Sequence, residues 1–286
     1  MPKPRPTTTI LLTVLTLVAF AGNSLLCRAA LRGGAMDPLA FTGLRLASGA
    51  LVLLPLAFVG DRERPRAPWP FGASVALLVY ATAFSLAYVG LDAGIGALLL
   101  FGSVQITMIG AGLDAGERLG AAQAVGILAA IGGLAWLLAP GASAPAPVSA
   151  ALMVVAGVAW GGYSLLGRGV ASPVRATARN FVLAGVPGVG LFALGSGRID
   201  GEGLVLACLS GALTSGVGYV IWYAALRGLT RTRAAVVQLA VPVVAAAGGV
   251  VLLGEATTPR LLAAGVLTLG GVAAVILAPP KTEATR

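Results

Sequence analysis

The chain has 286 residues, of which 58% are hydrophobic and only 10% charged, whereas about a quarter of the residues of a soluble domain carry a charge. This small number of charged side chains cannot cover a water-facing surface. The composition therefore predicts an integral membrane protein and excludes the soluble, disordered, collagen-like and disulfide-scaffold classes. The net charge of +9 does not indicate a nucleic-acid partner, because the 19 Lys and Arg residues are scattered between apolar runs.

Ten apolar runs in the sequence approach the length of about 20 residues that a helix needs to cross a bilayer. The connectors between them are short, so no extramembrane domain is available to hold a separate site. The sequence therefore predicts an all-α integral membrane fold of ten transmembrane helices. The runs cover residues 10–31, 39–59, 71–91, 94–113, 120–139, 149–167, 176–194, 203–226, 231–253 and 260–278.

The first run also fits a second interpretation. Lys3 and Arg5 precede it, and the small residues Ala19 and Ala21 lie within it, as in a cleaved secretory signal. The transmembrane interpretation is favoured, because this run has a counterpart later in the chain and its removal would leave the fold incomplete.

The Lys and Arg residues of the connectors predict the orientation, since short cytoplasmic loops are enriched in these residues. With the N-terminus inside, the external connectors hold only Arg28, Arg32, Arg198 and Arg260, and Arg45 lies within the second run. All other Lys and Arg residues then lie on the cytoplasmic side. Both termini are therefore expected in the cytoplasm.

The second half of the sequence repeats short motifs of the first half in the same order. The matches are residues 24–28 with 164–168, Asp37-Pro38 with Ser172-Pro173, Pro55 with Pro187, Tyr88 with Tyr223 and Gly116-Glu117 with Gly254-Glu255. Each copy holds five helices, an odd number, so the second copy enters the membrane from the opposite face. The sequence thus predicts two inverted repeats, residues 1–142 and 143–286, that form one transport domain.

Several of these motifs resemble the two EamA-type repeats of the drug/metabolite transporter superfamily, over the whole chain. The motifs are Gly22-Asn23-Ser24, Trp160-Gly161 with Tyr163, residues 116–119 and Leu253-Gly254-Glu255. The resemblance implies secondary transport of small metabolites by a multi-pass protein of the bacterial inner membrane, and it is strongest to exporters of aromatic amino acids. Ala21 stands where the family often has Trp, which leaves the substrate preference open.

Polar and aromatic side chains halfway along a transmembrane helix must face a cavity or another helix, because lipid offers no hydrogen-bond partner. We predict that these side chains line a central pocket, in which rings contact an apolar group and amides and hydroxyls bind an amino or carboxyl group. Helix packing is the alternative, and for the two glutamines both interpretations stay open. The residues are Asn23, Tyr80, Phe84, Gln105, Trp160, Tyr163, Tyr219 and Gln238.

Arg45 is the one clearly intramembrane charge in the sequence. It is a possible contact for a substrate carboxylate, but its distance of about two helical turns from the end of the run favours a side chain that extends to water. Two further groups have expected structural roles at helix ends. Trp69, Trp136 and Trp222 are expected to anchor at the headgroups, with lining of the pocket from below as the alternative for Trp222. Glu117 and Glu255 are expected to cap the helices that follow them.

Three prolines and one glycine pair bear on the packing and motion of the helices. Pro55, Pro187 and Pro242 lie within apolar runs and are hinge candidates, with static curvature as the alternative. Gly157 and Gly161 form a GxxxG pair that would allow close contact between helices.

The residue types that the chain lacks limit the transport mechanisms that it can use. The chain has no histidine, and none of its ten acidic residues lies mid-helix, so proton coupling lacks a titratable group. We therefore predict facilitated export of neutral amino acids, without cofactor, metal or obligate protein partner. No nucleophile, base or metal cluster indicates an enzyme. The remaining alternatives are a channel, or a carrier of sugars, nucleotide derivatives or cationic drugs with or without proton coupling.

Overall fold

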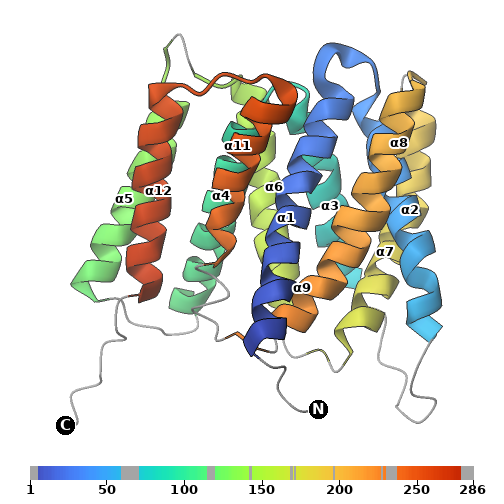
Figure 1. The fold of residues 1–286 in the computed structure, drawn as a ribbon, viewed down its shortest axis with the longest axis horizontal. Helices are drawn as coiled ribbons and strands as arrows, with labels where there is room; N and C mark the ends of the chain where they lie inside the picture. The colour runs from blue at the N-terminus through green and yellow to red at the C-terminus, as the bar shows by residue number, and fades with distance from the viewer. Residues whose placement is uncertain are drawn as a thin grey trace.

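The computed structural model describes residues 6–58, 71–114, 120–141, 144–167, 170, 172–195, 197–226, 228–229 and 237–277. Within these ranges every regular element is a helix, and the helices stand side by side as one bundle (Figure 1). Within the described part of the chain, eight helices are long and apolar enough to cross a membrane, and two shorter apolar helices stand among them. The predicted all-α, multi-pass membrane architecture is therefore confirmed.

The helices follow the predicted runs closely. In chain order they are α1 (Pro6–Leu31), the 3₁₀ turn η1 (Arg32–Gly34), α2 (Pro38–Phe58), α3 (Phe71–Tyr88), α4 (Ala93–Asp114), α5 (Ala121–Leu138), α6 (Pro147–Leu166), α7 (Pro173–Leu194), α8 (Gly201–Leu209), η2 (Ser210–Val217), α9 (Gly218–Leu226), α11 (Ala240–Leu253) and α12 (Pro259–Leu277). The elements α8, η2 and α9 follow one another without a break and form the eighth predicted span. The predicted start of the ninth run, at Arg231, lies outside the described residues.

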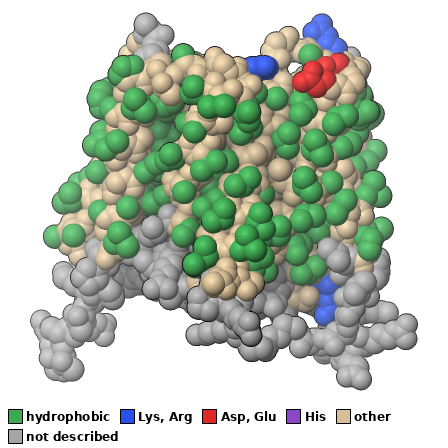
Figure 2. Space-filling model, viewed as in Figure 1, with side chains coloured by type: hydrophobic (Ala, Val, Ile, Leu, Met, Phe, Trp, Pro, Cys, Tyr) green, Lys and Arg blue, Asp and Glu red, His purple; other side chains and the backbone are tan. Residues whose placement is uncertain are grey.

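The surface of the bundle matches an apolar surrounding. Hydrophobic side chains cover its flank, and the charged side chains visible in Figure 2 lie towards its ends. Large exposed hydrophobic residues occur along the helices, for example Leu51 in α2, Leu128 in α5 and Val251 in α11. In water such a surface would be costly, whereas in a bilayer it faces lipid.

Contacts between the helices are symmetric when the first five spans are exchanged with the last five. α2 packs against α7 and α5 packs against α12. Helices α3 and α4 of the first half pack on α6 of the second half. Their equivalents in the second half, α8–η2–α9 and α11, pack on α1 of the first half. The chain therefore places equivalent helices of its two halves in equivalent surroundings.

Helices α1 and α6 run in opposite directions. Arg260, at the start of α12, donates through Nε to the Trp136 carbonyl near the end of α5, at 3.0 Å. The connector that leads into α6 therefore begins at the end of the bundle where α12 begins. Arg28, near the end of α1, bonds to Glu255 of the connector before α12, so α1 ends where α6 begins (Figure 1).

Small residues bring α6 close to α4, as the glycine pair predicted. A Cβ atom added at Gly157 would lie 2.5 Å from the Ser103 Cβ and 2.7 Å from the Leu100 carbonyl oxygen. A Cβ atom at Gly161 would lie 2.9 Å from the Thr107 Cβ. Both positions therefore require glycine for the helices to pack at this distance.

Substituting Gly157 by alanine is expected to destabilise the bundle, because the new methyl group would push α6 away from α4. Overpacking of this kind costs about 1–3 kcal/mol. Gly162 is the matched control, since a Cβ atom there would meet no heavy atom within 4 Å, and Gly162→Ala should leave stability unchanged or raise it. Thermal unfolding in detergent checks both, and equal melting temperatures for the two variants would contradict the close α4–α6 contact.

The three hinge candidates occupy different positions in their helices. Pro187 lies inside α7 and Pro55 lies near the end of α2. Pro242 lies in the first turn of α11, where proline is tolerated, and not in a helix interior as expected. The helical hydrogen-bond pattern is interrupted just before it, at Leu239, because proline offers no N–H group to the carbonyl four residues earlier.

Candidate functional site

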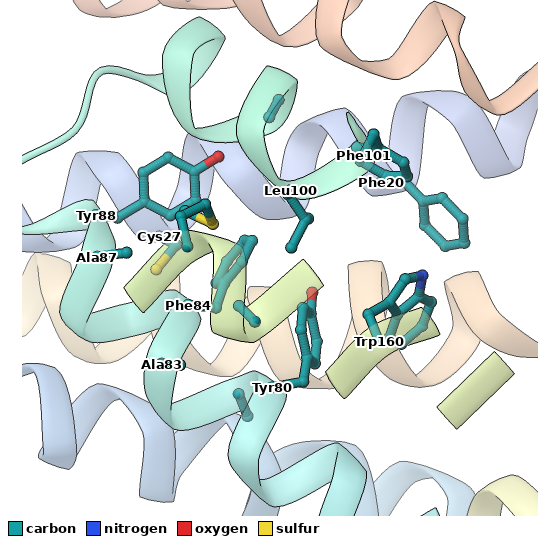
Figure 3. Close-up of a cluster of buried hydrophobic side chains, with 14 of the residues drawn as sticks. Phe20, Cys27, Tyr80, Ala83, Phe84, Ala87, Tyr88, Leu100, Phe101 and Trp160 are labelled. Atoms are coloured by element: carbon teal, nitrogen blue, oxygen red, sulfur yellow. The ribbon is translucent and has the colours of Figure 1, made fainter. Parts of the chain in front are cut away.

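Aromatic rings from several helices meet at the centre of the bundle. The ring centroid of Trp160, in α6, lies 4.9 Å from that of Tyr80 in α3 and 4.8 Å from that of Tyr219 in α9. Phe20 of α1 meets Trp160 edge-on at 6.1 Å. Figure 3 shows Tyr80, Trp160 and Phe20 in this cluster, with Phe84 one turn further along α3. Such geometries are the favourable ones for aromatic pairs.

The cluster encloses a small cavity. Its free space has room for about one water molecule. The lining residues are Phe20, Asn23, Ser24, Tyr80, Phe84, Leu100, Phe101, Trp160 and Tyr219. A solute larger than water therefore enters only when rings or helices separate, so the structure represents a closed form of the site.

Five of the eight predicted pocket residues line this cavity, namely Asn23, Tyr80, Phe84, Trp160 and Tyr219. Tyr163 lies behind the cavity wall, with its ring stacked on Trp160 at 5.3 Å, and its hydroxyl accepts a hydrogen bond from Asn180 at 3.2 Å. The two glutamines are buried but lie outside the lining. Gln105 Nε2 has no hydrogen-bond partner within the described part of the chain, and Gln238 precedes Leu239, which packs against Ala130 and Val272.

Asn23 is the centre of a polar network on one wall of the cavity. Its Nδ2 donates to the Tyr80 hydroxyl at 3.2 Å. Its Oδ1 accepts from the Ser210 hydroxyl at 2.7 Å, and the hydroxyls of Thr214 and Ser215 lie 3.3 and 3.4 Å away. One amide therefore connects α1, α3 and η2 through groups that lipid could not satisfy.

The hydroxyls on Asn23 come from an element that the sequence pattern did not predict. Residues Ser210–Val217 form a π-helical segment, in which each hydrogen bond spans five residues instead of four. The wider turn brings Ser210, Thr214 and Ser215 towards one acceptor. A run of small and hydroxyl residues in the middle of the eighth apolar run was the available sequence signal. Short π-helical segments occur frequently at functional sites.

Arg45 lies in the interior, which corrects the expectation that it extends to water. Its side chain is 1% exposed. Nη2 donates to the Tyr80 hydroxyl and Nε donates to the Ser215 hydroxyl, both at 3.1 Å. The guanidinium carbon lies 5.1 Å from the ring centre of Tyr80 and 4.9 Å from that of Phe84. These hydroxyls and rings replace part of its hydration, so the side chain does not need to reach the interface.

The tryptophans expected at the headgroups differ in their exposure. Trp136, near the end of α5, is 49% exposed, as an interfacial anchor would be. Trp222 is only 8% exposed and meets Phe20 edge-on at 5.9 Å, so the anchor interpretation is wrong for it. The reason is that α9 packs against α1, which turns this face of α9 inward. Trp69 lies outside the described residues.

Comparison with known proteins identifies the family. The model of the EamA-like transporter family matches residues 7–139 and, a second time, residues 148–277. The chain belongs to the EamA-like transporter family. This family is part of the drug/metabolite transporter superfamily, so the relationship inferred from the sequence motifs is confirmed.

Two further proteins are similar to this chain over almost its whole length. An uncharacterized protein of Pseudomonas aeruginosa is 55% identical over 282 residues, which cover 97% of each chain. A solved structure, titled only as the crystal structure of a protein, is 21% identical and superposes with a TM-score of 0.66 over 95% of this chain and 96% of that one. The second similarity shows a shared fold.

In this EamA-like transporter, a group of charged residues that we call the Arg28 latch closes the end of the bundle where α1 ends. The latch consists of Arg28, Asp92 and Glu255. Arg28 pairs with both acids at 3.0 Å and also donates to the Tyr88 and Val89 carbonyls. It thereby ties α1 to the α3–α4 connector and to the connector between α11 and α12.

Glu255 caps a different helix from the expected one. Its Oε2 accepts from the backbone N–H of Ala93, the first residue of α4, at 2.8 Å, and not from the start of α12. Gly254 explains this direction, because its left-handed backbone, with φ of 68°, turns the chain back towards α4 after α11 ends. Glu117, the other expected cap, lies outside the described residues.

Proposed function

We propose that this transporter exports neutral amino acids with apolar or aromatic side chains across the bacterial inner membrane, by alternating access around the central cavity. The observation that carries the proposal is the cavity itself, in which aromatic rings face a wall of amide and hydroxyl groups around Asn23. The rings suit an apolar side chain, and the polar wall suits the amino and carboxyl groups that all amino acids share.

Alternating access rests on two inverted five-helix repeats, with the first ending near residue 142. Three findings support this arrangement: the family model matches twice, α1 and α6 run in opposite directions, and the helix contacts are symmetric between the two halves. A pair of inverted repeats can take two related arrangements around a site at their interface, each open to one side.

The positions of the arginines support an orientation in which both termini lie in the cytoplasm. Arg28, Arg32 and Arg260 bond to residues at the end of the bundle where α1 ends, and the Arg198 carbonyl accepts from Asp37 just before α2. These are the four arginines expected outside. The end where α1 begins and α12 ends then faces the cytoplasm, in agreement with the positive-inside rule.

Export down the substrate gradient, without proton coupling, is the mechanism that the lining supports. None of the residues that line the cavity in the described structure is Asp or Glu, and the whole chain has no histidine. A site of this kind offers no group that gains or loses a proton near neutral pH.

Flux through proteoliposomes tests the proposal. Labelled phenylalanine, leucine and alanine are expected to show saturable flux, at the same rate with and without an imposed pH gradient, because no group in the cavity couples to protons. Protein-free liposomes are the control. Accumulation of an amino acid against its own gradient when a pH difference is imposed would overturn the facilitative mechanism, and absence of flux for the whole panel would overturn the choice of cargo.

A further inference from the structure

The guanidinium of Arg45 has no negatively charged partner in the described structure. Its two hydrogen-bond partners, the hydroxyls of Tyr80 and Ser215, are neutral. The ion pairs among the described residues both belong to Arg28. Nη1 of Arg45 is fully buried and has no hydrogen-bond acceptor within the described ranges. The full positive charge of Arg45 therefore lies inside the bundle, and its Nη1 group donates no hydrogen bond to the described residues.

An unpaired charge at this position is expensive, and the side chain cannot avoid it by losing a proton. Arginine keeps its charge in proteins. The two aromatic faces and two hydroxyls compensate only part of the lost hydration. A bound anion would supply both the countercharge and the missing acceptor, so the site is more stable with an anion than without one.

The guanidinium is one side chain away from the cavity. Tyr80 lines the cavity, and its hydroxyl accepts from both Asn23 Nδ2 and Arg45 Nη2. Phe84, which also lines the cavity, covers the guanidinium with its ring. A rotation of the Tyr80 ring would free Nη2 of Arg45 and remove the side chain that stands between the guanidinium and the cavity. The planar fork of the guanidinium nitrogens matches the two oxygens of a carboxylate.

We propose that Arg45 is the anion-binding group of the transport cavity and holds the carboxylate of the cargo, while Phe20, Trp160 and Tyr219 hold its apolar body. The proposal rests on the proposed function for the location of the cavity and deepens it by fixing the charge of the cargo. No acidic side chain lines the described cavity to pair with an ammonium group. The recognised class is therefore an apolar or aromatic monocarboxylate, in which an α-amino group is tolerated and not required.

Three ligands with the same aromatic ring separate the contributions of the two charged groups. Phenylalanine carries both groups, 3-phenylpropionate lacks the amino group and phenethylamine lacks the carboxylate. Isothermal titration of the detergent-solubilised full-length protein should show that 3-phenylpropionate binds at least as tightly as phenylalanine. Phenethylamine should bind at least tenfold more weakly. Equal or tighter binding of phenethylamine would overturn the proposal.

Variants of Arg45 test the residue itself. Arg45→Gln should weaken binding of both acids at least tenfold, whereas Arg45→Lys keeps the charge and should retain part of the affinity. Thr42→Ala is the matched control on α2, because the buried Thr42 hydroxyl donates only to the Pro38 carbonyl of its own helix, and it should leave binding unchanged. If Arg45→Gln does not fold, the ligand series on the unmodified protein decides the proposal alone.

The outcomes distinguish this proposal from the proposed function. Saturable amino-acid flux that is unaffected by Arg45→Gln would leave amino-acid export standing and overturn the anion site. Binding of 3-phenylpropionate that depends on Arg45, together with absence of amino-acid flux, would support the anion site and overturn the choice of cargo. Absence of binding for all three ligands would overturn the anion site.

Discussion

Substituting Arg28 by glutamine is expected to open the end of the bundle that the Arg28 latch closes. The guanidinium pairs with Asp92 and Glu255 and donates to the carbonyls of Tyr88 and Val89, and separation of α1 from these groups would break the contacts. Glutamine cannot replace the charge. A hydrogen bond to a charged group contributes about 1.5–3 kcal/mol, so loss of about 2 kcal/mol shifts the population roughly 30-fold towards the open form.

Cys27 provides a reporter next to the latch. Its side chain is fully buried and faces the core near Tyr88 and Phe84 (Figure 3), so a membrane-impermeant thiol reagent should not reach it in the closed form. In a Cys208→Ser background, Arg28→Gln should raise the rate of Cys27 modification at least tenfold. Arg32→Gln is the matched control, because Arg32 lies at the same end and donates to the Leu253 carbonyl. Equal modification rates in the two variants would contradict the latch.

Trp160→Ala is expected to abolish saturable flux. The indole meets the rings of Phe20, Tyr80, Tyr163 and Tyr219, so its removal leaves a void where the apolar part of the cargo would be held. The change should also cost about 3–5 kcal/mol of stability. Trp160→Phe keeps a ring at this position and should retain part of the flux.

Flux measurements and melting temperatures together test the role of Trp160. Trp136→Ala is the matched control, since it removes the same side chain from an exposed position near the end of α5 and should leave flux unchanged. If Trp160→Ala folds and its flux stays within twofold of the unmodified protein, then the ring cluster does not hold the cargo.

The helices could be predicted from the sequence because a bilayer imposes a simple length requirement on every span. The cavity residues could be predicted in part for a related reason: a polar or aromatic group halfway along a span, such as Asn23 or Tyr80, must avoid lipid. This rule gives the depth of a residue but not the direction of its side chain. Gln105 and Gln238 satisfy the rule equally well, and the structure places neither in the cavity lining.

The errors for Arg45 and Trp222 share one physical cause, which is that partners on other helices decide the environment of a side chain. Arg45 was expected at the interface, because the sequence does not show that Tyr80 and Ser215 would meet its guanidinium. Trp222 was expected at the headgroups for the same reason, since only the packing of α9 on α1 directs it inward. Depth along a span can be predicted locally, whereas the face that a side chain occupies depends on tertiary contacts.

The π-helical segment between α8 and α9 has a consequence for how the two ends of this span move. A helix that returns from π to α geometry in one turn releases one residue, and each residue of an α-helix accounts for roughly 100° of rotation. Such a conversion within Ser210–Val217 would rotate α9, with Tyr219, relative to α8. The eighth span would then act as a rotary joint, at which a change in helix type turns a cavity ring by about 100° with a shift of only about 1.5 Å along the helix axis.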